Sequence, residues 1–249
     1  MSIWRIIDSG PATASRNMAL DEELLREAIS PSALPVLRFY TWSPAAVSLG
    51  RFQDQERAVN ADACRRRGID IVRRITGGRA VLHCDELTYS IIARSDSDLF
   101  PNDILGTYKV IAAGLLAGLR ELGIAAEMVS RSGRHAGMVK SSPQEPACFS
   151  SPSWYEILVK GRKIIGSAQR RVGGAFLQHG SILIGYDPVL EAEVIPGGGM
   201  RDAVTCIRTE LGREVGPDEV KQAFREGFVR ALGMTFQERI VDCRNSPRT

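Results

Sequence analysis

Apolar residues along the chain follow two patterns, one typical of strands and one typical of helices. Alternating or continuous short apolar runs predict strands, whereas apolar residues spaced three and four apart predict helices. The predicted strands cover residues 4–8, 36–42, 69–75, 80–83, 87–93, 124–129, 155–159, 163–168 and 176–184. The predicted helices cover residues 17–29, 107–123 and 217–233. Strands and helices are intermixed, which predicts an α/β fold.

The helix predicted at 217–233 has the clearest boundaries. Pro217 suits the first turn, an apolar stripe runs from Val220 to Leu232, and Gly233 can end the helix. The stretch 130–147 carries little apolar weight and leads directly to Cys148. Such a stretch is either a surface excursion or a loop beside a site.

Composition limits the class of protein. The chain has 249 residues, 44% of them hydrophobic, and no apolar run long enough to cross a bilayer. We therefore expect one large soluble α/β domain, without a membrane partner. The N-terminal "MSIWRIIDSG" lacks the basic and apolar regions of an export signal, which predicts a cytoplasmic location. Five scattered cysteines without a CxxC argue against disulfides and a zinc ribbon.

The charge of the chain is mildly positive. A formal net charge of +3 is too small to imply nucleic acid binding. Arginines cluster within 64–68 and at 73–74, and Arg131, Arg134 and Lys140 follow later. These residues form either an ordinary solvated face or a docking surface for an acidic partner.

The most informative chemical candidate is Cys148 in "ACFSSPSWYE" (147–156), where small and turn-forming residues surround the thiol. Fifteen positions later comes Lys163, and a hairpin turn at Lys160 and Gly161 could bring the two regions together. A nearby ammonium lowers the pKa of a thiol and so favours the nucleophilic thiolate. From the residues alone, Cys148 is either this nucleophile or a small hydrophobic residue.

Other motifs leave alternatives open. Gly77 and Gly78 follow a predicted strand, and they form either a simple turn or a loop whose N–H groups approach a substrate oxygen. The "HCDE" run at 83–86 groups four metal-ligating types, but neighbours on a strand point to opposite faces, so we expect no metal site. His179 is either a hydrogen-bonded structural residue or a general base.

Several segments together resemble one known family. They are "WRIIDSG…NMALDEELL", "VLRFYTWSPAAVSLGRFQ", "RRITGGRAVLH…ELTYS", "ACFSSPSWYEILVKGRKIIGSAQRR" and "LQHGSILI". In this order they resemble the lipoate-protein ligase A and octanoyltransferase family, and most of all its LipM octanoyltransferase branch. The resemblance covers most of residues 3–185 and implies the biotin and lipoate ligase α/β fold, with a large mixed sheet.

The resemblance also implies an acyltransferase activity and its site. By this resemblance Cys148 is the acyl-thioester nucleophile, Lys163 lowers its pKa, and neither metal nor other cofactor is needed. The implied donor is octanoyl-acyl carrier protein, and the implied acceptor is the glycine cleavage H protein or another lipoyl domain. The implied substrate-binding residues are Arg73, Arg74, Gly77, Gly78, His83, Gly166, Ser167, Ala168, Gln178, His179 and Gly180.

Three other functions remain open. An ATP-dependent lipoate-protein ligase uses the same scaffold and the equivalent lysine, and an octanoyl amidotransferase between lipoyl domains also uses a cysteine. A carrier-binding module without catalysis is the third. The sequence departs from the family at Cys84, where relatives commonly carry an acidic residue, and it ends with "ERIVDCRNSPRT", where relatives often continue. By the resemblance we expect a single catalytic domain over 1–249, without the separate accessory domain found in many ATP-dependent ligases.

Overall fold

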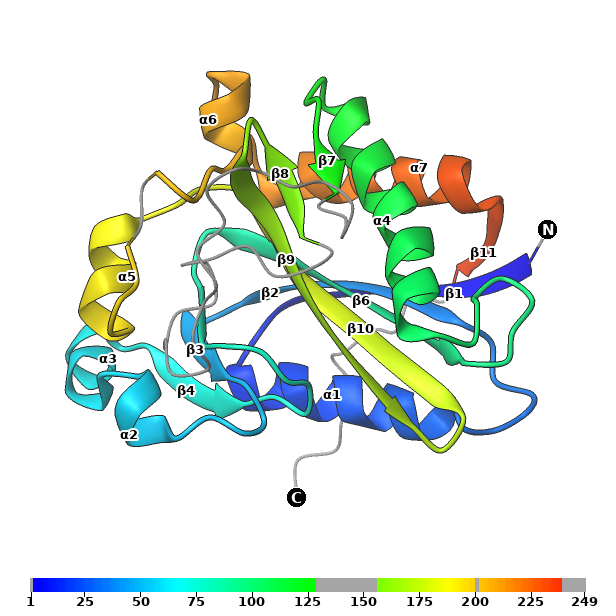
Figure 1. Ribbon diagram of the computed structural model, residues 1–249, viewed down its shortest axis with the longest axis horizontal. Coiled ribbons are helices and arrows are strands. Elements are labelled where there is room, and N and C mark those ends of the chain that lie inside the picture. The colour runs from blue at the N-terminus through cyan, green and yellow to red at the C-terminus, as the bar shows by residue number, and fades with distance from the viewer. Residues whose placement is uncertain (1, 129–155, 200–201, 239–249) are drawn as a thin grey trace.

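The computed structural model describes residues 2–128, 156–199 and 202–238. Its large mixed sheet contains, in spatial order, β11 (Met234–Glu238), β1 (Ser2–Ala12), β2 (Val36–Trp42), β6 (Glu86–Arg94), β10 (Ala175–Leu183), β9 (Arg162–Val172), β8 (Ile157–Val159) and β7 (Glu127–Met128). A small sheet contains β4 (Asp70–Arg73), β3 (Ala46–Leu49) and β5 (Val81–His83). Figure 1 shows the small sheet beside one end of the large one.

Helices lie on both sides of the large sheet. The long helices are α1 (Ala14–Glu27), α4 (Ile104–Glu121) and α7 (Pro217–Leu232), and the short ones are α2 (Gln55–Ala58), α3 (Ala61–Arg67), α5 (Pro188–Val194) and α6 (Ile207–Leu211). Helices α4 and α7 lie together on one side and α1 on the other (Figure 1). Within the described ranges, no helix is long and apolar enough to cross a membrane.

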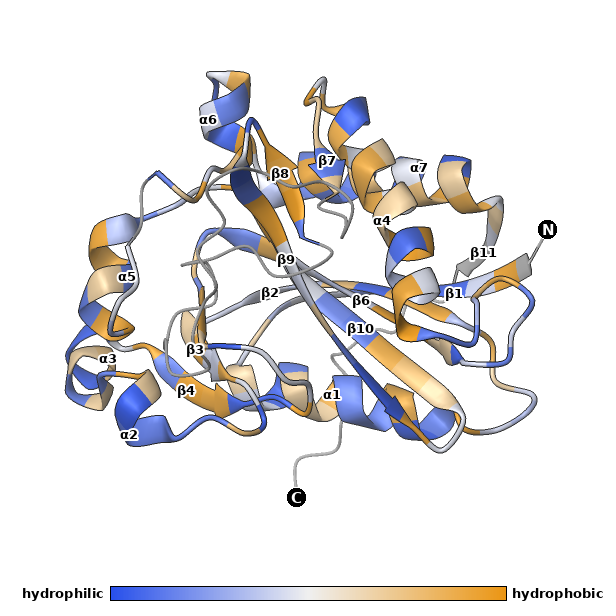
Figure 2. Cartoon of the chain, in the orientation of Figure 1, coloured by the Kyte–Doolittle hydropathy of each residue, from blue (hydrophilic) through white to orange (hydrophobic). Residues whose placement is uncertain are grey.

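One face of the large sheet carries the main hydrophobic core. Alternate residues of its central strands point to this face and pack under α4 and α7, as the period of two in a strand requires. From the strands they include Leu37, Phe39, Leu87, Tyr89, Ile91, Phe176 and Ile182, and from the helices Ile111, Leu115, Phe224 and Phe228. Figure 2 shows hydrophobic and hydrophilic residues alternating along α4 and α7, as expected for helices with one buried face.

Glycines allow α4 and α7 to pack closely. A Cβ on Gly227 would meet the backbone N of Gly118 at 2.2 Å, and one on Gly114 would meet the Phe228 ring at 2.1 Å. These glycines therefore let the α7 backbone and the Phe228 ring reach α4 at a distance that any side chain would prevent.

The opposite face of the sheet changes its chemistry along the strands. At one end, Val36, Ile92 and Leu177 pack against Leu24 and Leu25 of α1 in a second apolar cluster. Further along the same strands the side chains become polar, and this polar part forms the floor of the cavity described below.

Most elements predicted from the sequence are confirmed. Helices α1, α4 and α7 lie within three residues of the predicted bounds, and the turn at Lys160 and Gly161 joins β8 to β9 with positive φ at both residues (50° and 77°). The strand predicted at 69–75 is shorter, because β4 ends at Arg73 and the chain turns into the glycine loop. The strand predicted at 124–129 has only Glu127 and Met128 as β7 in the described residues. Strand β3 was not predicted, and it is held in place by pairing with β4 and β5.

Candidate active site

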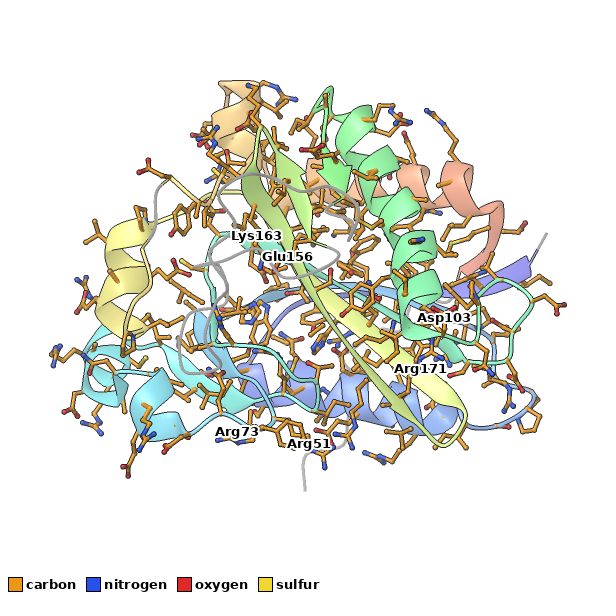
Figure 3. All side chains as sticks on the ribbon, in the orientation of Figure 1. Arg51, Arg73, Asp103, Glu156, Lys163 and Arg171 are labelled. Atoms are coloured by element: carbon orange, nitrogen blue, oxygen red, sulfur yellow. The ribbon has the colours of Figure 1, made fainter. Side chains whose placement is uncertain are left out.

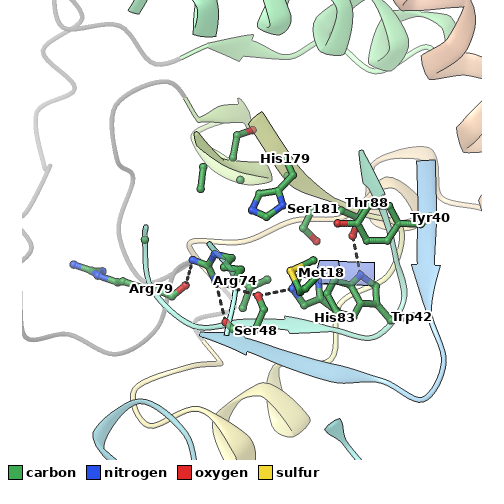
Figure 4. Close-up of a pocket in the computed structure, with 16 residues that line it drawn as sticks. Met18, Tyr40, Trp42, Ser48, Arg74, Arg79, His83, Thr88, His179 and Ser181 are labelled. Atoms are coloured by element: carbon green, nitrogen blue, oxygen red, sulfur yellow. Dashed lines mark hydrogen bonds between the residues drawn. The ribbon is translucent and has the colours of Figure 1, made fainter. Parts of the chain in front are cut away.

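A cavity of about 220 Å³ lies between the polar face of the large sheet and the small sheet (Figure 4). Strands β9 and β10 form one wall, and β3, β5 and the loop after β4 form the other. The lining residues are Met18, Tyr40, Trp42, Ser48, Arg74, Gly78, Arg79, Val81, His83, Thr88, Gly166, Ser167, Ala168, His179, Gly180 and Ser181.

Two rows of paired residues cross the large sheet at this cavity. The first row runs over four strands and contains Tyr40, Thr88, Ser181 and Gly166. The second row is parallel to the first, two residues away from it on each strand. It contains Arg38, Ser90, His179 and Ala168. Because glycine and alanine stand at the β9 ends of the rows, the cavity has room on that side.

A hydrogen-bonded network centred on Asp21 of α1 supports the second row. The Asp21 carboxylate accepts hydrogen bonds from Arg38 (2.6 Å), from the Tyr40 hydroxyl (3.0 Å) and from Ser90 (2.9 Å), and all these side chains are buried. Burial alone would raise the pKa of Asp21, but the hydrogen bond from His179 and the charge of Arg38 leave it below its usual value. The carboxylate is therefore ionised and fully paired.

His179 connects this network to the loop after β4. Its Nδ1 lies 3.0 Å from Asp21 Oδ2 and its Nε2 lies 2.7 Å from Thr76 Oγ1. A carboxylate can only accept, so Nδ1 must donate, and in the neutral ring Nε2 then accepts from the Thr76 hydroxyl. Nε2 of His179 is thus engaged by Thr76 and helps to hold the loop, although the sequence also allowed a general base at this position.

The opposite wall is built around His83 of β5. Its Nε2 lies 2.7 Å from Ser48 Oγ, and its ring stacks on Trp42 with centroids 4.0 Å apart. Its Nδ1 lies 3.3 Å from Glu86 Oε1, without the geometry of a hydrogen bond. Burial lowers the pKa of His83 and outweighs the opposite effect of Glu86, and the charge of Arg74 lowers it further.

The loop at residues 75–79 is fixed by Arg74. The guanidinium donates to the backbone oxygens of Ser48 (2.8 Å), Gly77 (2.9 Å) and Arg79 (2.7 Å). The loop also lies directly against Gly50, where an added Cβ would come within 1.9 Å of the Gly78 oxygen. The side chain of Arg74, predicted to bind substrate, thus lines the cavity and also holds its own loop in place.

Lys163 lies beyond the cavity on β9. It precedes Gly166 by three residues, so the two Cα atoms are roughly 10 Å apart at about 3.3 Å per residue. The side chain is 2% exposed and forms an ion pair with Glu156, which is 3% exposed. Figure 3 shows the two side chains next to each other. The backbone N–H of Lys163 donates to Ala203 at 2.8 Å, which fixes the strand where the pair is formed.

The structure brings most of the predicted substrate-binding residues into the lining of one cavity. These are Arg74, Gly78, His83, Gly166, Ser167, Ala168, His179 and Gly180. Three others are not part of this lining. Arg73 donates to the backbone oxygens of Gly50, Arg51 and Gln53. The backbone oxygen of Gly77 accepts from Arg74, and Gln178 points to the other face of the sheet, where it donates to the Tyr89 hydroxyl. The predicted nucleophile Cys148 and the stretch 130–147 lie outside the described residues.

Sequence reasoning missed the partners of these residues. Glu156, Asp21 and Thr76 were not singled out, although each contacts a predicted site residue. One signal was available: in "ELTYS" the small hydroxyl residues Thr88 and Ser90 alternate with Leu87 and Tyr89, which marks a polar strand face. Residues 83–86 do not converge on a metal, since no group of three His, Cys, Asp or Glu side chains in the described part of the chain could hold one.

Comparison with known proteins identifies the family. The model of the lipoyl protein ligase A/B catalytic domain matches residues 13–229. The chain belongs to the lipoyl protein ligase A/B family. The resemblance seen in the sequence is therefore confirmed.

Named relatives in this family are similar over nearly the whole chain. The octanoyltransferase LipM of Moorella thermoacetica is 41% identical over 243 residues, which cover 94% of this chain and 88% of that protein. The octanoyltransferase LipM of Bacillus subtilis is 40% identical over 242 residues, covering 93% and 87%. These relatives confirm the predicted enzyme class, an acyltransferase of protein lipoylation.

Solved structures of the family confirm the predicted fold class. A crystal structure of lipoate-protein ligase A bound with ATP matches with a TM-score of 0.79 and 26% identity, over 98% of this chain and 90% of that one. A putative lipoate protein ligase from T. acidophilum with bound lipoic acid matches with a TM-score of 0.76 and 26% identity, over 98% and 91%. Ligases and transferases of the family therefore share this scaffold.

Proposed function

We propose that this chain, as a single cytoplasmic catalytic domain, moves an octanoyl group from octanoyl-acyl carrier protein to a lysine of a lipoyl-carrier protein. The acceptor is the glycine cleavage H protein or another lipoyl domain. The reaction proceeds through a thioester on Cys148, and Lys163 favours the thiolate form of that cysteine.

The observation that carries this proposal is the position of Lys163. A lysine that is almost completely buried is rare unless it is paired, and here the pair with Glu156 stands where β9 leads into the cavity. The cavity has side chains able to enclose an acyl chain, and the relatives at about 40% identity are named octanoyltransferases. A buried cation beside an acyl pocket suits the activation of a thiol.

The first half-reaction exchanges one thioester for another. The Cys148 thiolate attacks the carbonyl carbon of the donor, the bond from that carbon to the donor sulfur breaks, and the donor thiol leaves with a proton. The thioester bond broken and the one formed are of the same kind, so this step is nearly neutral in free energy.

The second half-reaction forms an amide. The amine of the acceptor lysine attacks the acyl carbon, the bond to Cys148 Sγ breaks, and the proton lost by the amine returns a thiol to the enzyme. An amide is more stable than a thioester, so the overall transfer needs no ATP.

The ATP-dependent ligase remains a second candidate function. The observation that favours it is the match to a lipoate-protein ligase A bound with ATP, which extends over 98% of the chain. A ligase activates a free acid with the nucleotide, whereas the proposed transferase takes a donor that is already activated. Nucleotide dependence therefore separates the two.

The decisive experiment combines the full chain with octanoyl-acyl carrier protein and apo H protein, and follows every protein by intact mass. We expect octanoylation of the acceptor without nucleotide, and a poor reaction when octanoic acid and ATP replace the donor. A strict requirement for ATP would show a ligase instead. Transfer from octanoylated H protein to a dehydrogenase lipoyl domain, in preference to the carrier donor, would show an amidotransferase.

A further inference from the structure

A basic groove lies behind the loop at residues 75–79, on the side away from the cavity. It has a volume of about 480 Å³ and takes side chains from α1, from the loop after β3, from β4 and from β9. Its lining residues are Glu22, Leu25, Arg26, Arg51, Arg73, Arg74, Ile75, Arg170 and Val172. Figure 3 shows Arg51 and Arg73 next to each other at the lower edge of the molecule.

Four arginines of this groove are not neutralised by any carboxylate of the described residues. Arg26, Arg51, Arg73 and Arg170 form no ion pair with any residue that the structure describes, whereas Arg65 pairs with Asp62 and Arg67 with Glu193. The cluster at 64–68, which the sequence allowed as a docking surface, is thus largely neutralised by its own neighbours. With these four arginines and a single carboxylate, Glu22, in its lining, the groove keeps a positive field that suits an anionic partner.

An exposed aromatic ring stands beside the groove. Phe52 is 86% exposed, the highest exposure of any large apolar side chain in the described ranges, and the Arg51 guanidinium lies 5.2 Å from the centre of its ring. Aromatic and arginine side chains are enriched in the centres of protein interfaces. An exposed phenylalanine next to unpaired arginines is therefore typical of a surface that a protein covers.

Two features connect the lining of the groove to the lining of the cavity. Arg74 lines both, and β9 passes from Ala168 in the cavity wall to Arg170 in the groove. Two residues on a strand are roughly 7 Å apart, and Arg170 is roughly 23 Å along β9 from Lys163. A protein docked in the groove would thus stand away from the ion pair, as a carrier that delivers its acyl group on a flexible arm requires.

We propose that this groove, together with Phe52, docks the acidic surface of the carrier protein that brings the acyl thioester. The proposal rests on the proposed function, since it names the surface that receives the donor. Arg26, Arg51 and Phe52 contact the carrier, whereas Arg73 and Arg170 also hold the loops beside the groove through backbone oxygens. The carrier's charge speeds its encounter with the enzyme, and the aromatic ring is covered in the complex.

The test changes only the exposed contacts. Arg26→Glu, Arg51→Glu, the double variant and Phe52→Ala are compared with the wild type in the first half-reaction, with thioester on Cys148 measured by intact mass. Two donors are used: the octanoyl thioester of the acidic carrier, and octanoyl N-acetylcysteamine, a small uncharged thioester. Arg16→Glu is the matched control, because it makes the same charge change on α1, about 15 Å from Arg26 and outside the groove.

We expect the double variant to lose about tenfold or more in kcat/KM with the carrier donor, because each reversal replaces attraction by repulsion. Its rate with the small donor should stay at the wild-type level, and Arg16→Glu should match the wild type with both donors. Added salt should slow the wild type with the carrier donor and leave the small donor unaffected. Phe52→Ala should weaken only the carrier reaction.

Other outcomes are distinguishable. Equal rates of the double variant and the wild type with the carrier donor would overturn the docking surface and leave the proposed function intact. Normal acylation followed by slow transfer to the acceptor would also overturn it, because the groove would then receive the acceptor. Failure of the wild type to form a thioester with either donor would instead contradict the proposed function itself.

Discussion

Lys163 and Glu156 form an ion pair in which both side chains are almost completely withdrawn from solvent, at 2% and 3% exposure. Sequence reasoning treated Lys163 as a lone cation, but its ammonium is shared with a carboxylate. Such a pair fixes the ammonium in one place and reduces the field that it exerts on other groups. Glu156 therefore determines both where the positive charge stands and how strongly it acts on a nearby thiol.

The free energy of unfolding should depend on the ion pair between Lys163 and Glu156. Glu156→Gln leaves a buried ammonium without its carboxylate, and Lys163→Met leaves a buried carboxylate without its ammonium, so each should destabilise the fold by about 3 kcal/mol or more. The double variant removes both charges and should recover much of that loss while it stays inactive. Urea unfolding of the four proteins measures the coupling. Additive losses in the double variant would show that the two charges do not depend on each other.

The reactivity of Cys148 should depend on Lys163. In Lys163→Ala the pH at which Cys148 reacts with iodoacetamide should rise, and acylation near neutral pH should slow. Lys163→Arg keeps the charge but not the shape, so partial rescue is the most we expect. Peptide mass analysis separates this thiol from the others.

Two other cysteines serve as internal controls for that measurement. Burial raises the pKa of the Cys64 thiol, and burial together with Asp85 raises the pKa of Cys84, so both should react slowly near neutral pH. Replacing either should leave the octanoyl thioester in place, and Cys148→Ala should abolish it. An unchanged alkylation profile in Lys163→Ala would contradict the activation of Cys148 by this lysine.

The length of the acyl chain should matter. The cavity has a volume of about 220 Å³, and a chain longer than the space allows would have to displace buried side chains at a cost of about 1–3 kcal/mol. Octanoyl donors should therefore acylate the enzyme much faster than palmitoyl donors carried in the same way. Competition between the two, read by intact mass, gives the ratio directly. Equal rates would mean that the chain does not enter the cavity.

The free energy of unfolding should decrease as the pH is lowered, because His83 is buried. Burial lowers its pKa below the usual 6.5, so the folded protein binds the proton less readily than the unfolded chain. The stabilisation is present above the unfolded pKa and is lost as the pH falls through the lowered folded pKa. His83→Gln should therefore lose less stability than the wild type between about pH 7.5 and about pH 5.5. Chemical denaturation at both pH values measures this, and identical slopes would contradict it. The lowered pKa of Asp21 acts in a separate window, below its unfolded value of 3.8.

The contact between Gly50 and the loop at 75–79 should be essential. In Gly50→Ala the new methyl group would overlap the Gly78 oxygen, so the loop must move, and kcat/KM and thermal stability should both fall. Gly77→Ala is the matched stability control, because its Cβ would have nothing within 4 Å. A Gly50→Ala protein as active and as stable as the wild type would show that the loop moves without cost.

The sequence predicted the elements better than it predicted their partners. The long helices and the β8–β9 turn follow from local chemistry, since capping residues, apolar stripes and a Lys-Gly turn act within a few positions. The pairing of β3 with β5 and of β10 with β6 joins residues far apart in the chain, and no local pattern encodes it.

The site shows the same division. Gly77, Gly78 and His179 were candidates from the residues alone, and the family resemblance assigned them, together with His83, to substrate binding. Asp21 contacts His179 across 158 positions, and Thr76 contacts it across 103, so no spacing in the sequence links them. Glu156 is only seven positions from Lys163. The β8–β9 turn that separates them was predicted, so their meeting could have been inferred from its two-residue geometry.

The floor of the cavity consists of strand residues, which has a consequence for how the enzyme can be redesigned. Its two rows of side chains are roughly 7 Å apart, as alternate residues on a strand must be. A substitution at Thr88 or Ser181 changes the space over the first row, and the side chains of the Asp21 network that occupy the second row can stay as they are. Under the proposed function, single replacements in these strand rows should change the length of acyl chain that the cavity accepts, without rebuilding any loop.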